Sequence, residues 1–409
     1  MFESLKRAID EIFGSVIRPI KDWVLRQSWG VRVACLIVIA LLAFTWWKPQ
    51  TVVGMSQQAS LYWRSWRNPS DRIPLSRSAQ QATALALKRL APSTNADLSA
   101  DLPQSPMTPW SASQSVLALR SAGWEIPDKP AYLAFVNAGR FAPDCFCWTE
   151  LVDEPRSEVT AFVGGWVLAA FAEIGEPVSA ADLDYVLQRQ NSAGWWAMFP
   201  ESGASQYQST YTTAWIAFGL HKQRVAGLIP ADRRAAVDRA ISRATMWLMR
   251  VRMGARWRAH PNAPETDVPE ALSGFVLHVL HQASALDLTD VDRAWLDTLP
   301  QKDLEPTSLD KHYNVLQYGH RSAIDHIVDI RLPWILLATA DAYANGTAQQ
   351  KARTLNWIEQ ILRSPEVRGA DTEGTDWVRA EVLLGIAETS KLVECKDCQT
   401  AARTATKDR

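Results

Sequence analysis

The sequence Glu158-Val-Thr-Ala-Phe-Val-Gly-Gly-Trp166 opens a stretch of small and apolar residues that runs to Gly175. A helix built from it would have almost no polar face, and such a helix is normally buried. Ser179 then caps a second segment, which is apolar at helical spacing along one side only. The segment ends in the loop Gln190-Asn-Ser-Ala-Gly-Trp-Trp196. A buried helix followed by an amphipathic one predicts a helical hairpin that needs stacked copies of itself.

Copies of this hairpin occur along most of the chain. The predicted inner helices are apolar or small on every side, and they cover residues 110–122, 158–175, 209–221, 268–282, 331–344 and 377–390. The predicted outer helices are amphipathic, and they cover residues 76–90, 130–139, 181–189, 232–252, 290–299 and 349–363. Residues 92–109 are rich in Ser, Pro and Asp and are predicted as a loop. The pattern predicts an all-α fold, a closed (α/α)6 toroid of concentric inner and outer helices.

Two motifs connect this pattern to a known superfamily. The loop Gln190-Asn-Ser-Ala-Gly-Trp-Trp196 is similar to the glutamine-tryptophan repeat of squalene-type cyclases, and Ser209-Thr-Tyr-Thr-Thr-Ala-Trp215 follows it on the next helix. On these residues the chain resembles the terpenoid cyclase and protein prenyltransferase superfamily over residues 76–392. The resemblance implies an α/α toroid and, as one option, an enzyme acting on an isoprenoid or another lipid.

The catalytic motifs of that superfamily are incomplete. A proton-initiated cyclase needs an Asp-x-Asp-Asp run, whereas Asp182-Leu-Asp184-Tyr and Asp290-Val-Asp292-Arg each stop short of it. A protein prenyltransferase uses an Asp-x-Cys pair on zinc, whereas Asp144 and Cys145 are adjacent. The resemblance therefore favours a non-catalytic toroid, because a fold alone confers no activity.

Composition limits the possible partners. The chain has 409 residues, 47% of them hydrophobic, which is enough for one large core. Its net charge of −1 gives no general attraction for nucleic acid. The 19 tryptophans suit either an apolar ligand cavity or a tightly filled core of buried helices.

The N-terminal region predicts membrane attachment. Residues 1–30 form an amphipathic pattern typical of a helix on the membrane surface, and residues 31–47 form an apolar run broken only by Arg32. We expect an uncleaved single-span anchor rather than a cleaved signal peptide, followed by a juxtamembrane linker at 48–75. More cations precede the span than follow it closely, which favours a cytoplasmic N-terminus and an extracytoplasmic toroid, in the inner membrane if the protein is bacterial.

Four cysteines outside the predicted span occur as two close pairs, Cys145 with Cys147 and Cys395 with Cys398, the latter in the C-terminal tail 393–409. If the toroid is exported, disulfides between the pairs would hold the first and last repeats together. If it is cytoplasmic, four thiolates could hold a structural zinc ion. The charge bias favours the disulfides, and no cofactor is expected with them.

The candidate functional residues fall in two groups. The first could provide acid, base or metal chemistry on the inner helices: Glu158, Glu270, His278 and His281, the two histidines sharing one helix face. The second combines aromatic surface with hydrogen-bonding groups on loops at the mouth of the ring: Trp195, Trp196, Tyr207, Tyr211, His312 and His320. We expect a membrane-tethered binding or scaffold module that holds a hydrophobic ligand or a protein segment. The alternatives are a lipid-modifying enzyme and a sugar-processing α/α barrel with paired carboxylates.

Overall fold

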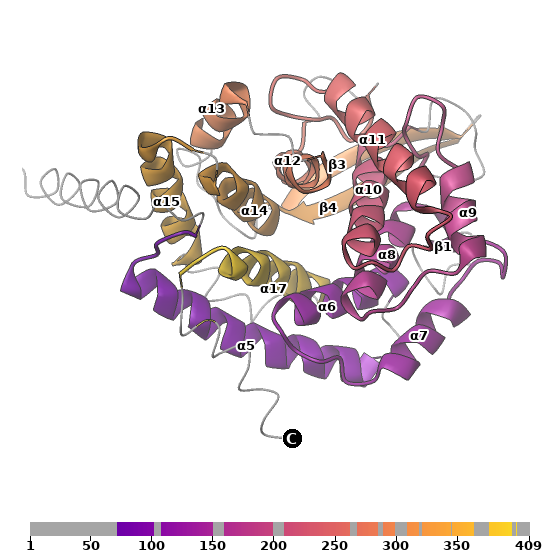
Figure 1. Ribbon diagram of the computed structural model, residues 1–409, viewed down its shortest axis with the longest axis horizontal. Coiled ribbons are helices and arrows are strands. Elements are labelled where there is room, and N and C mark those ends of the chain that lie inside the picture. Colours follow the sequence, from indigo (N-terminus) through magenta and orange to yellow (C-terminus); the bar gives the residue numbers. More distant parts are fainter. Residues whose placement is uncertain are drawn as a thin grey trace, which may run out of the picture. The chain divides into compact units, whose positions relative to one another are not determined.

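Helices make up most of the described chain (Figure 1). The computed structural model describes residues 72–101, 108–149, 159–198, 208–261, 268–284, 289–298, 309–318, 321–344, 346–363, 376–394 and 398. Strands occur there only as two antiparallel pairs. The prediction of a helical protein is thus confirmed at the level of its secondary structure.

Six central helices account for the buried segments predicted from the sequence. They are α6 (Pro109–Ser121), α8 (Phe162–Glu173), α10 (Thr210–Val225), α12 (Glu270–Ser284), α14 (Arg331–Ala344) and α17 (Asp376–Lys391). Each packs against the next in this order, and α17 packs against α6. The order of contacts therefore returns to its starting helix.

The amphipathic segments form flanking helices that lie outside the central six (Figure 1). They are α5 (Arg77–Asp101), α7 (Lys129–Ala138), α9 (Ala180–Gln188), α11 (Arg234–Arg250), α13 (Asp290–Thr298) and α15 (Ala348–Leu362). Each packs on a central or another flanking helix, for example α7 on α6, α11 on α10 and α15 on α14. Capping side chains fix where three of these helices begin. Asp128, Ser179 and Thr347 each accept a hydrogen bond from a backbone N–H in the first turn of the helix that follows.

Four aromatic rings from successive central helices pack against one another, and we call them the aromatic centre. Trp166 of α8 stacks on Trp215 of α10 with ring centroids 3.5 Å apart, and Trp215 stacks on Phe275 of α12 at 4.2 Å. Trp334 of α14 lies 4.8 Å from Phe275 and 6.2 Å from Trp166. All four side chains are buried. At this level, the space between these helices is filled by side chains.

A recurring tryptophan contact shows that the hairpin is repeated in three dimensions. The indole N–H of Trp148, Trp196 and Trp257 donates to a backbone carbonyl 12, 10 and 9 residues earlier, in or at the end of the preceding flanking helix. The backbone N–H of Trp196 also donates to the Thr213 hydroxyl, and that of Trp257 to the Ser273 hydroxyl. The indole bond thus recurs in three repeats, and in two of them the same tryptophan also ties the flanking helix to the next central helix.

The predicted end of the first flanking helix was wrong. Residues 92–109 were expected to be a loop, but α5 continues through Pro92 to Asp101. Proline removes one helical hydrogen bond, and this cost is offset by tertiary packing. Ala91, Thr94 and Leu98 are completely buried, and Asp97 pairs with Arg379 of α17 at 2.9 Å.

The polar connection before α14 was expected as a loop, but it contains a β-hairpin. Strand β3 (Leu309–Tyr318) pairs with β4 (Arg321–Ile330), with Leu309 opposite Ile330. The second pair is short: β1 (Trp148–Thr149) lies beside β2 (Val159–Thr160), directly before α8. In residues 321–330 polar and apolar residues come mostly in pairs rather than in strict alternation, so the sequence carries no clear signal for this strand.

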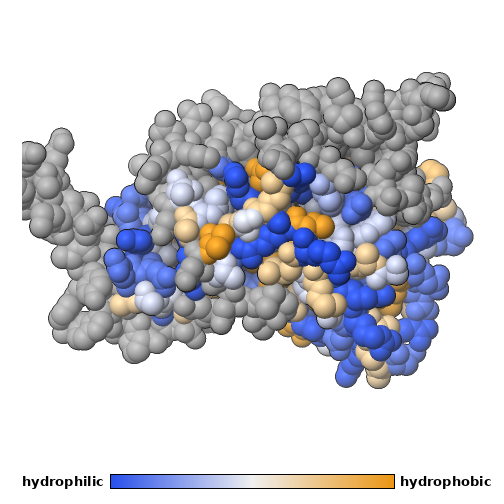
Figure 2. All heavy atoms as spheres, turned by 90° about the horizontal axis from the view of Figure 1, so that it is seen from above, coloured by the Kyte–Doolittle hydropathy of each residue, from blue (hydrophilic) through white to orange (hydrophobic). Residues whose placement is uncertain are grey.

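The predicted surface helix and membrane span, and the predicted linker 48–75 as far as residue 71, lie outside the described residues. Within the part of the chain that the structure describes, no helix has both the length and the apolar character needed to cross a bilayer. On the face shown in Figure 2, hydrophilic residues interleave with small, separate groups of hydrophobic ones.

Candidate functional site

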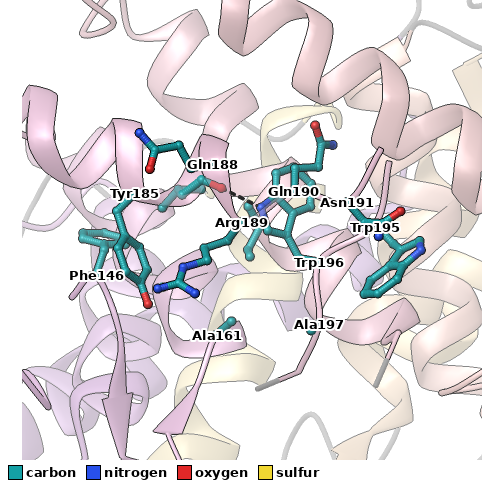
Figure 3. A pocket seen from close by; sticks show the side chains of 13 residues that line it. Phe146, Ala161, Tyr185, Gln188, Arg189, Gln190, Asn191, Trp195, Trp196 and Ala197 are labelled. Carbon is teal, nitrogen blue, oxygen red and sulfur yellow. Dashed lines mark hydrogen bonds between the residues drawn. The ribbon is translucent and has the colours of Figure 1, made fainter. Parts of the chain in front are cut away.

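A cavity of about 410 Å³ lies beside the loop Gln190–Trp196, and we call it the Gln190 cavity. Its walls come from the loop before β1, the start of α8, the end of α9, the loop before α10 and one residue of α10. The lining residues are Phe146, Ala161, Gly164, Tyr185, Val186, Gln188, Arg189, Gln190, Asn191, Trp195, Trp196, Ala197 and Ile216. Figure 3 shows Phe146, Tyr185 and Arg189 on one side and Trp195 on the other.

Gln190 fixes the loop to the neighbouring repeat. Its side-chain amide donates to the carbonyls of Gly194 and of Ala240 on α11, and its oxygen accepts from Arg243 of α11 at 2.5 Å. Gly194 has a φ of +109°, and a Cβ at this position would lie 2.3 Å from the Arg243 carbonyl oxygen. Only glycine permits both the backbone conformation and the close approach of α11. The glutamine and glycine of the motif therefore have structural roles.

The aromatic walls of the cavity are held by specific contacts. Phe146 packs edge-on against Trp148 at 4.8 Å, and the Arg140 guanidinium lies over the Phe146 ring. The indole N–H of Trp196 donates to the Val186 carbonyl on α9. Phe146, Trp195 and Trp196 each expose 6% of their surface or less, so packing holds these aromatic walls in place, while Gln188, Arg189 and Asn191 add polar groups.

The structure places the first cysteine pair but not the whole of the second. Cys145 and Cys147 lie next to each other, with Cα atoms 5.1 Å apart, and Cys395 lies outside the described residues. The expected cross-bridges between the two pairs therefore stay a prediction. At the start of the tail, the amide of Ile73 donates to the Leu392 carbonyl, and that of Glu394 donates to the Ile73 carbonyl. Backbone hydrogen bonds therefore tie the tail to the residues preceding α5.

The two predicted histidines of α12 meet a carboxylate that the sequence analysis did not select. His278 Nδ1 lies 2.7 Å from Asp341 Oδ2 on α14, and His281 Nε2 lies 3.8 Å from the other oxygen. Gln282 also donates to Asp341. Glu270, the partner considered from sequence, lies in the first turn of α12, two to three turns away along the helix. Among the described residues, no group of three or more His, Cys, Asp and Glu side chains has metal-binding geometry.

A partly buried ion network lies near the ends of α8, α10 and α17. The Lys222 ammonium lies 2.9 Å from Glu173 and 3.8 Å from Glu388. Burial alone would lower the lysine pKa, but the two carboxylates outweigh burial and raise it. Burial would likewise raise the pKa of Glu388, yet Lys222, Lys391 and the Ser121 hydroxyl lower it to about 2. Lys222 and Glu388 therefore stay ionised at neutral pH.

His221 makes folding stability depend on pH. Burial, assisted by the charges of Arg224 and Lys222, lowers its pKa from 6.5 to about 4. Between these values the unfolded chain binds a proton that the folded chain does not, so the free energy of unfolding falls as the pH drops. We expect a loss of about 2 kcal/mol between pH 6.5 and 4.5, measured by urea unfolding of the full-length chain.

The variant His221→Asn should lose much less unfolding free energy between pH 6.5 and 4.5, because asparagine has no proton to gain. The interval above pH 4.5 separates His221 from Glu388, whose contribution is lost only as the pH falls from 4.5 towards 2. If the variant loses as much unfolding free energy over this pH interval as the native chain, a group other than His221 must cause the loss.

The predicted binding residues are only partly brought together. Trp195 and Trp196 line the Gln190 cavity. Tyr211 is instead buried on α10, where its ring packs against Phe162 and Trp215. His312 lies in β3 opposite Ile327. Three further candidates, Tyr207, His320 and Glu158, lie outside the described residues.

Several functional features were missed by sequence analysis. Phe146, Tyr185 and Arg189 line the cavity but were not selected. Tyr185 lies on α9 one turn before Arg189, the residue that caps this helix, so their nearness in sequence to the Gln190 motif was the available signal. Phe146 lies between Cys145 and Cys147, far from the motif in sequence, and had no such signal.

No protein-family model, curated protein or solved structure matches this chain significantly.

Proposed function

We propose that this chain is a membrane-anchored α/α toroid of the terpenoid cyclase-like kind that binds an apolar ligand in the Gln190 cavity. The closed order of contacts among the six central helices, with amphipathic helices outside them, supports the toroid. In this proposal residues 31–47 are the anchor, and they hold the cavity near the lipid phase in which apolar ligands concentrate.

The observation that carries the binding function is the aromatic lining of the cavity. Pockets for small molecules generally have volumes of about 300–1,000 Å³ and apolar walls with a few polar groups. The Gln190 cavity, with about 410 Å³, four aromatic side chains on its walls and the polar groups of Gln188, Arg189 and Asn191, fits this description. The aromatic centre argues against a ligand between the central helices at that level, because four closely packed rings occupy the space.

A second candidate is a membrane-tethered enzyme acting on an isoprenoid or another lipid. The contact between His278 and Asp341 favours it, since a carboxylate that orients a histidine can support proton transfer. In that case a lipid incubated with the protein would be converted into a product. The binding proposal requires only retention of the lipid unchanged.

The binding proposal predicts that Trp195→Ala weakens the binding of a neutral alkyl probe, decanol, to the full-length chain. Loss of the indole removes part of the apolar contact, and we expect roughly a tenfold increase in Kd. Ala161→Leu should weaken binding as well, because Ala161 also lines the cavity and the larger side chain would fill part of it. Isothermal titration below the aggregation limit of decanol measures both effects.

Trp295→Ala is the matched control, because Trp295 lies on α13 and does not line the cavity. Equal decanol affinity for the native chain and all three variants would mean that decanol binds elsewhere. The far-ultraviolet circular dichroism of each variant checks that its helices are intact.

A further inference from the structure

A second hollow adjoins the Gln190 cavity on the outer side of the repeat, and we call it the arginine groove. It has a volume of about 390 Å³ and lies between α9 and α11. Its lining residues are Asp184, Leu187, Gln188, Arg233, Ala236, Arg239 and Arg243. Gln188 lines both hollows, and Arg243 of the groove binds Gln190 of the cavity.

The groove carries an excess of positive charge. Three arginines and one aspartate line it, which leaves two unbalanced positive charges. Asp184 is already occupied, because Arg233 binds both of its carboxylate oxygens at 2.8 and 2.9 Å. The nearby Asp232 pairs with the same Arg233, and Asp238 pairs with Arg224. The acids of this region therefore leave Arg239 and Arg243 without a carboxylate.

The two remaining arginines have unused donors. Arg239 is exposed on α11 and has no ion-pair partner among the described residues. Arg243 donates to Gln190 through Nη2, but its buried Nε has no hydrogen-bond partner in the described part of the chain. Guanidinium groups bind carboxylate and phosphate oxygens strongly and with defined geometry. The chain as a whole has a net charge of −1, so this concentration of cations is local.

We infer that the two adjoining hollows form one site for an anionic amphiphile, a long-chain alkyl phosphate or carboxylate. Its apolar chain lies in the Gln190 cavity and its anionic head contacts Arg239 and Arg243 in the groove. This inference rests on the proposed apolar binding and specifies the chemical class of the ligand. A membrane phospholipid and a free fatty acid share this chemistry.

The test compares three probes with the same alkyl chain on the full-length protein: decyl phosphate, decanol and decyltrimethylammonium. The anionic probe should bind on the order of tenfold more tightly than decanol, and the cationic probe should bind least. The advantage should shrink as salt is raised, because Arg239 is exposed to solvent. Arg239→Glu should bring decyl phosphate to the affinity of decanol or below it, while decanol binding stays unchanged.

Arg250→Glu is the matched control, since Arg250 is an exposed arginine at the end of the same helix and does not line the groove. Equal binding of decyl phosphate and decanol by the native chain would overturn the anionic specificity and leave the apolar site standing. An anionic advantage that survives Arg239→Glu, or is lost equally in Arg250→Glu, would also overturn it. If none of the probes binds, the proposed function itself fails.

Two further probes distinguish a two-chain phospholipid from a single-chain ligand. Inorganic phosphate and a soluble diacyl phosphatidic acid with short chains are titrated against the decyl phosphate complex. Competition by the lipid alone indicates a phospholipid with two chains, whereas competition by neither indicates a single-chain ligand. Competition by inorganic phosphate at equal concentration would show that the alkyl chain adds nothing, which contradicts the joint site.

Discussion

Replacing Gly194 with valine should lower the free energy of unfolding by about 4 kcal/mol, because two separate costs add at this position. The φ of +109° strains any residue that has a Cβ, and a β-branched residue most of all. In addition, the new Cβ would lie 2.3 Å from the Arg243 carbonyl oxygen and would push α11 away from the loop. Urea unfolding of the full-length chain measures the change.

Gly175→Val separates these two costs. Gly175 has a φ of +67° and no atom within 4 Å of its Cβ position, so it should show the backbone strain without the clash. We expect a loss of about 1–2 kcal/mol there. Equal losses at Gly175 and Gly194 would mean that α11 does not approach the Gln190 loop as the structure shows.

Replacing Trp215 with alanine should cost about 3–5 kcal/mol, the range found for large aromatic residues in cores. Trp215 exposes 1% of its surface and contacts Trp166, Phe275 and Trp334 of the aromatic centre. Its removal leaves a cavity between four central helices that the rigid surroundings cannot close. Thermal and urea unfolding both report the loss.

The control for this substitution is Phe141→Ala, because Phe141 is 56% exposed and should cost about 0.5 kcal/mol or less. A small effect of Trp215→Ala would contradict a filled centre and would return attention to a ligand cavity between the central helices. Binding of indole to the Trp215→Ala variant would show that the vacated space keeps the shape of the lost side chain.

The helices were predictable because buried helices consist mostly of small and apolar residues, and flanking helices are apolar on one side only. The central helix α8 begins four residues after the predicted start and ends two residues before the predicted end. Val159 and Thr160, assigned to this helix from sequence, belong to the short strand β2. Such short pairings depend on a partner elsewhere in the chain, here Trp148 and Thr149, and so leave little local signal.

Long-range packing explains the larger errors. Pro92 normally marks a helix end, but the buried Leu98 and the ion pair of Asp97 with Arg379 continue the helix beyond it. Arg379 is 282 residues away in sequence, so no local pattern could reveal this contact.

In the candidate sites, too, residues with a local sequence signal were predictable and residues that depend on long-range contacts were not. Trp195 and Trp196 were predictable from their motif, because the motif residues and the cavity wall belong to one loop. Asp341 was not, because it meets His278 across 63 residues of sequence on another central helix. Arg239 and Arg243 read as ordinary solvated residues of an amphipathic helix, and only the position of α9 beside α11 makes them line a groove.

Ligand binding in the Gln190 cavity is tested most directly by photo-crosslinking of the full-length chain with a photoreactive decyl phosphate, followed by peptide mapping. We expect labels at the cavity and groove residues, within 146–197 and 233–243, and their loss in Ala161→Leu. Labels confined to residues 1–47, or placed on the central helices around Trp215 and His278, would contradict a ligand site in the Gln190 cavity.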